Sequence, residues 1–343
     1  MDRLAHLVGS IPLNSAEEAM TAALDRLGPR LRWVPDGETG ERRDWIIHII
    51  ESFRAHPDLE LKRDGSWSDY DDTPVFRVRR GHSLTGDSLD FGHVAAFERN
   101  YAIFRQLREQ RRRDDLAYQV GLPGDFDLAL FTLGPVGALR HRRAFTEATL
   151  ATIRRIHERA GDDVVFQIEV PAELVFVARM PPPAQGPMAA LLARGITGLV
   201  ADAPAGAHFG VHLCLGDMNH RALGRMRDVT PLVLLCNAIV SAWPARRPLE
   251  FVHAPFAAAI EPPPNSRRFY APLRRLELPP DVEFVAGFVH EDQSLDAQRA
   301  LRDHLDGLLG RRVAVATACG LGRREPAPAL ATMERAAALC AEE

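Results

Sequence analysis

The chain is short of cysteine, of net charge and of long apolar runs, and each shortage excludes a class of protein. Only four cysteines occur in 343 residues, too few for the disulfide framework of a small secreted scaffold. The formal net charge is -4 and the charges are interspersed, which gives no reason to expect a nucleic-acid partner. No apolar run approaches the roughly 20 residues that span a membrane. The chain opens without a signal-peptide pattern, so we expect a cytoplasmic protein whose thiols stay free to bind metal.

Nucleotide-binding fingerprints are also absent: no G-x-G-x-x-G follows a first strand, and no P-loop occurs. What the chain does contain is an alternation of strand-like and helix-like segments. The predicted strands are 4–10, 31–35, 117–122, 164–170, 209–215, 232–236, 249–253, 282–290 and 313–318. The predicted helices are 15–27, 44–53, 93–112, 145–160, 188–194, 221–226, 294–309 and 328–341. The Gly-Pro segment 133–136 is predicted to be a loop.

Repeated strand-then-helix units favour an α/β fold with a parallel sheet, and their number over this length favours a (β/α)8 TIM barrel. A doubly wound open sheet is the alternative, and it usually carries the fingerprints that are missing. We expect one catalytic domain over 1–343. The weakly patterned stretch 57–92, in the N-terminal half, is predicted to be an insertion that acts as a lid or binding loop.

One stretch, Gly210–Asp217, offers two metal ligands. His212 and Cys214 are two residues apart in a run that is typical of a short buried strand, and such residues point to the same face. An imidazole and a thiol on one face are suited to a soft or borderline metal such as zinc. A tetrahedral site needs further ligands, and Cys319, about a hundred residues downstream, supplies another thiol.

The chemistry-bearing residues follow a positional rule. In a (β/α)8 barrel the active site lies at the carboxyl ends of the strands. Polar and metal-ligating side chains fall at or just past the predicted strand ends at Ser10, Asp36, Glu169, His212, Cys214, His253, His290 and Cys319. Residues scattered over a surface would not align in this way, so we expect these side chains to share one site.

Seven short motifs, taken in order, carry a resemblance to a known family. They are Val8–Pro12, Asp36–Arg42 with Asp44, Leu133–Val136, Gln167–Ala172, His212–Cys214, Val289–His290 and Cys319–Arg323. As an ordered set they resemble the catalytic C-terminal barrel of the cobalamin-independent methionine synthase family, over nearly the whole chain. The Cys-Gly-Leu-Gly-Arg motif is one residue shorter than the family's before its Arg.

The resemblance implies a function and a set of roles. In that family Zn²⁺ holds a thiol as its thiolate, and a methyl group passes from a folate to the sulfur. The implied function is therefore a zinc-dependent methyl- or alkyltransferase with small-molecule thiol and alkyl-donor substrates. The expected catalytic residues are His290, as the acid near the metal, and Asp36. The expected substrate-binding residues are Ser10, Glu38, Glu169 and Arg323. The expected metal ligands are His212, Cys214, His253 and Cys319.

Two departures from the family's pattern leave alternatives. The family's third zinc ligand is a Glu at a strand end, where this chain offers either His253 or Glu250, three residues apart and so on opposite faces. The family's Asp-Glu pair is Glu169 and Val170 here, which favours a different substrate. Two alternative functions remain. One is a metal-independent lyase or decarboxylase that resembles uroporphyrinogen decarboxylase and works through Asp36. The other is a non-catalytic barrel that binds a small molecule.

Overall fold

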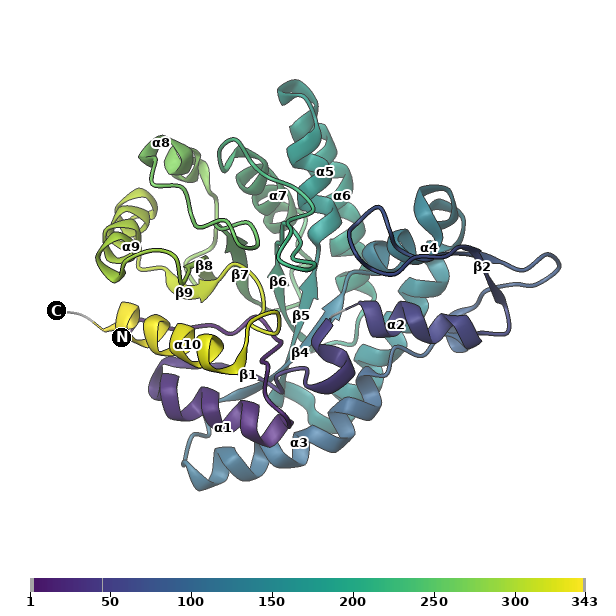
Figure 1. Cartoon of the computed structure of the whole chain (residues 1–343), viewed down its shortest axis with the longest axis horizontal. Helices are drawn as coiled ribbons and strands as arrows, with labels where there is room; N and C mark the ends of the chain where they lie inside the picture. The colour runs from purple at the N-terminus through teal and green to yellow at the C-terminus, as the bar shows by residue number, and fades with distance from the viewer. Residues whose placement is uncertain (1–2, 45, 342–343) are drawn as a thin grey trace.

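The computed structural model describes residues 3–44 and 46–341 as an α/β fold, in which helices surround a curled parallel sheet (Figure 1). The sheet has seven strands in the order β1-β4-β5-β6-β7-β8-β9, and every neighbouring pair is parallel. The strands are β1 (Trp33–Pro35), β4 (Ala117–Pro123), β5 (Val164–Glu169), β6 (His208–His212), β7 (Leu249–Pro255), β8 (Glu283–Val289) and β9 (Ala314–Thr317). The predicted parallel α/β architecture is thereby confirmed.

The eighth strand, predicted at 4–10, is reduced to a few backbone hydrogen bonds around Ala5. Ala5 forms an isolated parallel bridge with Val315 of β9, and its N–H donates to the Arg30 carbonyl, shortly before β1, at 2.9 Å. The segment therefore runs between the two edge strands without a ladder to either among the described residues. The described residues thus form a curled, seven-stranded half-barrel, which agrees with a TIM-like architecture, while the eighth strand and the full closure of the predicted barrel are not confirmed.

Helices flank this sheet (Figure 1). They are α1 (Ala16–Leu27), α2 (Ile47–Ser52), α3 (His93–Gln110), α4 (Asp125–Ala160), α5 (Pro171–Arg179), α6 (Pro182–Asp202), α7 (Thr230–Ser241), α8 (Arg267–Tyr270), α9 (Leu295–Leu309) and α10 (Pro326–Cys340). Short 3-10 segments occur at 28–30, 40–44, 53–55, 86–88, 161–163 and 271–275. Within the described ranges, no helix combines the length and the apolarity that a bilayer crossing requires.

Local sequence explains where several of these helices begin and end. Ser15 caps α1 by accepting from the Glu18 N–H at 3.1 Å, and Gly28 ends that helix with a φ of 50°. Ser294 caps α9 in the same way through the Ala297 N–H. A hydroxyl that satisfies an orphan N–H of the first turn fixes a helix start. The predicted positions of α1 and α9 follow from these signals.

Three local predictions are wrong. The run 232–236 is part of α7 rather than a strand, and 221–226 forms no helix. The Leu133–Val136 segment is not a loop but a kink inside α4, where Gly134 has a φ of 69° and Pro135 follows. The backbone leaves the helical region at Gly134, so two helical segments meet there at a kink, and Pro135, which has no N–H to donate, is tolerated at the start of the second segment.

The stretch 57–92 has a structure of its own. Strands β2 (Leu59–Arg63) and β3 (Val75–Val78) pair antiparallel into a hairpin that packs beside α4 (Figure 1). The residues between them, 64–74, return toward the carboxyl end of the main sheet, where Asn219 donates to the Trp67 carbonyl at 2.7 Å. The hairpin therefore brings its connecting loop to the edge where the predicted site lies.

The side chains inside the curled sheet form a small apolar cluster of their own. It consists of Trp33, Val165, Phe251, Val285, Ala314 and Ala316, while a much larger cluster joins the outer face of the sheet to the helices. The interior is thus filled near the amino ends of the strands. Polar side chains occupy the level above it, toward the carboxyl ends.

Candidate metal centre

Three neighbouring strands present polar side chains at one level of the sheet. The register pairs Glu169 of β5 with His212 of β6, and His212 with His253 of β7. Paired residues of adjacent parallel strands point to the same face. All three are more than nine-tenths buried. The strand ends therefore place a carboxylate and two imidazoles side by side above the apolar interior.

Two glycines allow this row to form. A Cβ at Gly210, two residues below His212, would overlap the aromatic ring of Phe251, which fills that space. A Cβ at Gly287 of β8 would stand 2.8 Å from the Nε2 atom of His253. Close side-chain approach is a common reason for a glycine inside a strand. Each glycine thus makes room for a ring that supports the row.

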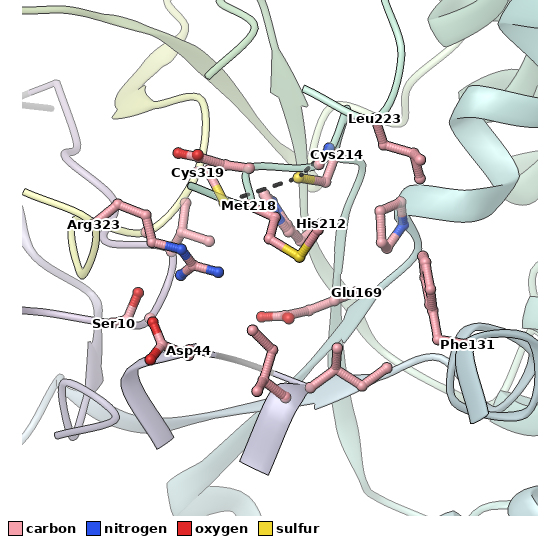
Figure 2. A pocket seen from close by; sticks show the side chains of 18 of the residues that line it. Ser10, Asp44, Phe131, Glu169, His212, Cys214, Met218, Leu223, Cys319 and Arg323 are labelled. Carbon is pink, nitrogen blue, oxygen red and sulfur yellow. Dashed lines mark hydrogen bonds between the residues drawn. The ribbon is translucent and has the colours of Figure 1, made fainter. Parts of the chain in front are cut away.

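Two cysteines from distant parts of the chain join His212. Cys214 lies two residues past the end of β6 and Cys319 two residues past the end of β9, and their sulfurs are 3.9 Å apart (Figure 2). One ligand atom each from His212, Cys214 and Cys319 lies within 4.8 Å of the others, in the one group of this kind among the described residues. The structure therefore brings these three residues together, as the sequence predicts.

The two thiols differ in their proton affinity. The pKa of Cys214 is raised well above its usual range because its S–H donates to Cys319 and because it is buried. Accepting that hydrogen bond lowers the pKa of Cys319. The Gly216 N–H donates to the Cys214 sulfur at 3.3 Å and would stabilise a thiolate there. A metal cation that bound both sulfurs would displace the proton of the Cys214 thiol.

His253 is not brought into this group. Its Nδ1 atom is 2.7 Å from Nδ1 of His212, and its Nε2 atom is 2.9 Å from the Thr317 carbonyl oxygen. Both ring nitrogens are therefore engaged, and burial lowers the pKa of His253 to about 4. The alternative ligand Glu250 lies toward the opposite end of the sheet, bonded to His208 at 2.6 Å. The structure thus places His253 behind His212 and Glu250 outside the site.

Two carboxylates face each other on the wall opposite the sulfurs. A Cβ at Gly121 would stand 2.8 Å from an Oε1 atom of Glu38 and 3.0 Å from that of Glu169, so both carboxylates lie over this glycine. Burial, followed by the charge of Glu169, raises the pKa of Glu38 well above its usual range. Gln167 donates to Glu169 at 2.9 Å and holds that carboxylate in place. A cation arriving between the two acids would relieve their repulsion.

Asp36 lies beneath this wall rather than in the cavity. Its carboxylate is bonded to Arg42 at 2.6 Å, to Asn100 at 2.7 Å and to Tyr118 at 3.1 Å, and it also accepts from the Glu38 N–H. Burial acts to raise the pKa of Asp36, but the charge of Arg42 and these hydrogen bonds outweigh it and lower that pKa. Both carboxylate oxygens of Asp36 accept hydrogen bonds from neighbouring residues, including the Glu38 N–H. Asp36 therefore holds the loop that carries Glu38.

Ser10 and Arg323 close the cavity on the side of the last strand. Ser10 Oγ accepts from the Gly322 N–H at 3.3 Å, and its carbonyl accepts from the Leu321 N–H at 2.7 Å, which ties the N-terminal segment to the Cys319 loop. The Arg323 guanidinium points into the cavity near Asp44 (Figure 2). Arg323 and Asp44 thus bring a positive and a negative group to the same side of the cavity.

His290 follows the last residue of β8 and is 1% exposed. Its Nδ1 accepts from the Asp292 N–H at 3.2 Å, so in the neutral ring Nε2 carries the proton. That buried Nε2 atom has no hydrogen-bond partner among the described residues. Val289 is in register with Thr317, so His290 is next to the segment that leads to Cys319, although it does not line the cavity.

Several residues of the cavity carried no signal in the sequence. They are Ile46, Trp67, Tyr70, Phe131, Asp217, Met218 and Leu223. Tyr70 comes from the loop of the hairpin, and its hydroxyl lies against the space that a Cβ of Gly216 would fill. Its pKa is raised by burial first and by the neighbouring cysteines second. An aromatic residue in an unpatterned stretch gives no clue to its neighbours, so only the fold identifies it.

The fold and this site define a class: an α/β protein with a curled parallel sheet, whose carboxyl edge holds a His-Cys-Cys group beside a charged cavity. Two solved structures share the fold. One is a B12-independent methionine synthase from Shewanella sp. W3-18-1 in complex with selenomethionine, with a TM-score of 0.59 and 14% identity over 98% of this chain and 96% of that chain. The other is a candidate vitamin B12-independent methionine synthase from Listeria monocytogenes, with a TM-score of 0.59 and 11% identity over 99% and 98%.

This likeness establishes the fold, and it agrees with the family that the sequence motifs resemble. No protein-family model matches the chain, and no curated protein matches its sequence. The roles of individual residues therefore have to be argued from the site itself.

Proposed function

We propose that this protein is a zinc-dependent methyl- or alkyltransferase that acts on a small-molecule thiol. The observation that carries the proposal is the convergence of His212, Cys214 and Cys319 beside a cavity with charged walls. Structural neighbours that are methionine synthases support a methyltransferase-type enzyme on this fold.

The donor set suits zinc. Two sulfurs that each lie about 2.3 Å from one zinc ion at a tetrahedral angle are about 3.8 Å apart, and the Cys214 and Cys319 sulfurs are separated by 3.9 Å. Two thiolates and one imidazole satisfy three of four positions, as in catalytic zinc sites that keep one position for substrate. Bound zinc would hold the sulfur of an incoming thiol as its thiolate at neutral pH.

The chain's own residues would hold the two ends of such a thiol. Glu38 and Glu169 form an acidic pair suited to an ammonium group, and Ser10 lies beside them as a further acceptor. Arg323, on the side of the last strand, is suited to a carboxylate or another anionic group. A thiol that carries both groups, such as an amino thiol acid, matches this distribution of charge.

In the transfer step, the thiolate sulfur forms a bond to the alkyl carbon while the bond between that carbon and the donor breaks, and the donor leaves with the electron pair. A proton must reach the leaving group. We propose His290 as its source, since its buried Nε2–H has no hydrogen-bond partner among the described residues and the ring lies next to the segment that leads to Cys319. Asp36 would contribute by orienting Glu38 and Arg42 rather than by exchanging protons.

Cobalt(II) substitution tests the proposal. Cobalt-loaded protein should gain sulfur-to-metal charge-transfer absorption when homocysteine is added, with release of one proton. Cys319→Ser should abolish the effect, whereas the control Cys236→Ala, in α7 and away from the cavity, should preserve it. Zinc-loaded protein with 5-methyltetrahydrofolate and homocysteine then tests transfer itself. Failure of homocysteine and 2-mercaptoethanol alike to alter the cobalt spectrum would refute the thiol-binding role.

A further inference from the structure

Two hydrogen bonds link His212 to the backbone through a second imidazole. Nδ1 of His212 is 2.7 Å from Nδ1 of His253, and Nε2 of His253 is 2.9 Å from the carbonyl oxygen of Thr317. The carbonyl is an acceptor only, so His253 must donate to it from Nε2. In this series of hydrogen bonds the proton of His253 is therefore on Nε2.

The remaining proton positions follow from that first one. His253 and His212 are 0% and 2% exposed, and such burial disfavours a charged imidazole. A neutral His253 that is protonated at Nε2 has only a lone pair at Nδ1. The short contact between the two Nδ1 atoms then requires His212 to be the donor, so the proton of His212 is on Nδ1. Its Nε2 is left with the free lone pair that a metal ligand needs.

We infer that His253 is a positioning residue that holds His212 in the tautomer able to bind metal through Nε2. The consequence for metal binding rests on the proposed function, but the tautomer itself does not. A metal-ligating histidine commonly donates its second ring N–H to a carboxylate or a carbonyl. Here an imidazole takes that place and passes the hydrogen bond on to Thr317.

The surroundings keep the His253 ring in this position. Gly287 leaves the space for it, because a Cβ there would be 2.8 Å from its Nε2 atom. The His6 ring lies on another side, with the two ring centroids 5.9 Å apart. The peptide N–H of Leu213 donates to the His253 carbonyl at 3.0 Å, so the two strands are also joined beside the two rings. A histidine at 253 is thus held by packing and by hydrogen bonds.

The direct test is a long-range ¹H–¹⁵N correlation spectrum of the full chain, labelled with ¹⁵N-histidine and freed of metal with a chelator. We expect the Nδ1–H tautomer for His212 and the Nε2–H tautomer for His253. Assignments come from His212→Gln and His253→Asn, each of which removes one set of signals. An Nε2–H tautomer at His212 would overturn the inference, whether or not the protein binds zinc.

Metal affinity gives a second readout, measured by competition with a chromophoric zinc chelator. His253→Leu removes the acceptor and should weaken zinc binding about 10- to 100-fold. His253→Asn keeps an oxygen near the position of Nδ1 and should restore much of the affinity together with the His212 tautomer. If His253→Leu is folded and binds zinc as wild type does, the inference is wrong while the proposed function stands. If wild type has the expected tautomers but binds no zinc, the proposed function fails and the role of His253 in fixing the tautomer stands.

Discussion

His6 offers a quantitative test of how the interior of the sheet is built. Its ring is 2% exposed, with Nε2 3.1 Å from the Gln167 side-chain oxygen, and its buried Nδ1 has no hydrogen-bond partner in the part of the chain that the structure describes. Burial first, and the neighbouring His253 second, lower the pKa of His6 from 6.5 to about 3. In the unfolded chain the same side chain titrates near 6.5.

The sign of the effect follows from proton uptake. Between pH 6.5 and about 3 the unfolded chain binds a proton at His6 that the folded protein does not. The stabilisation is therefore complete above pH 6.5 and is lost as the pH falls toward 3. At about 1.4 kcal/mol per pH unit, His6 costs the folded state roughly 2 kcal/mol between pH 6.5 and pH 5.

The perturbation is His6→Gln, which keeps a donor for Gln167 and removes the titration. Other groups also change the free energy of unfolding of each protein with pH. The raised pKa values of Glu38 and Asp127, for example, stabilise the folded state as the pH falls, which is opposite to the effect of His6. The difference in free energy of unfolding between wild type and His6→Gln, followed over pH, reports the titration of His6. Urea unfolding of metal-free protein, followed by tryptophan fluorescence at pH 7.5, 6 and 5, should show the variant gaining roughly 2 kcal/mol relative to wild type by pH 5. A difference that stays constant with pH would refute the reasoning.

Three further substitutions probe the site. Asp36→Asn removes one charge of a buried pair and places an amide N–H among the donors of Arg42 and Asn100, so the free energy of unfolding should fall by about 3 kcal/mol or more in urea titrations; an unchanged midpoint would contradict this. Gly210→Ala overlaps the Phe251 ring and should cost about 1–3 kcal/mol while lowering zinc affinity, which calorimetric unfolding and chelator competition would detect. Glu38→Gln should raise the KM for an amine-bearing thiol more than for 2-mercaptoethanol, and equal effects on both would argue against an ammonium site.

The sequence was sufficient to find the candidate metal ligands, because they are rare side chains in recognisable local contexts. His212, Cys214 and Cys319 converge as expected, and Glu38, Glu169, Ser10 and Arg323 line the same cavity. The role of His253 could not be read from spacing. The position of the His253 ring depends on the register between β6 and β7 and on the absence of a side chain at Gly287. Neither can be read from the sequence of one strand alone.

The errors in the fold have similar causes. The run 232–236 is apolar enough for a buried strand, but it belongs to α7, which is buried against α5, α6 and the 3-10 segment 271–275. A short apolar run does not distinguish a strand from a buried helix. The Gly-Pro pair at 134–135 predicts a loop, whereas in the structure it forms only a kink, because the backbone leaves the helical region at Gly134 alone.

Zinc K-edge X-ray absorption of the zinc-loaded protein tests the central claim most directly. The account predicts one zinc per chain with two sulfur neighbours at about 2.3 Å and at least one nitrogen neighbour at about 2.0–2.1 Å. Cys319→Ser should remove one sulfur from that shell. A shell of oxygen and nitrogen alone, or zinc bound at a small fraction of one equivalent after reconstitution, would contradict it.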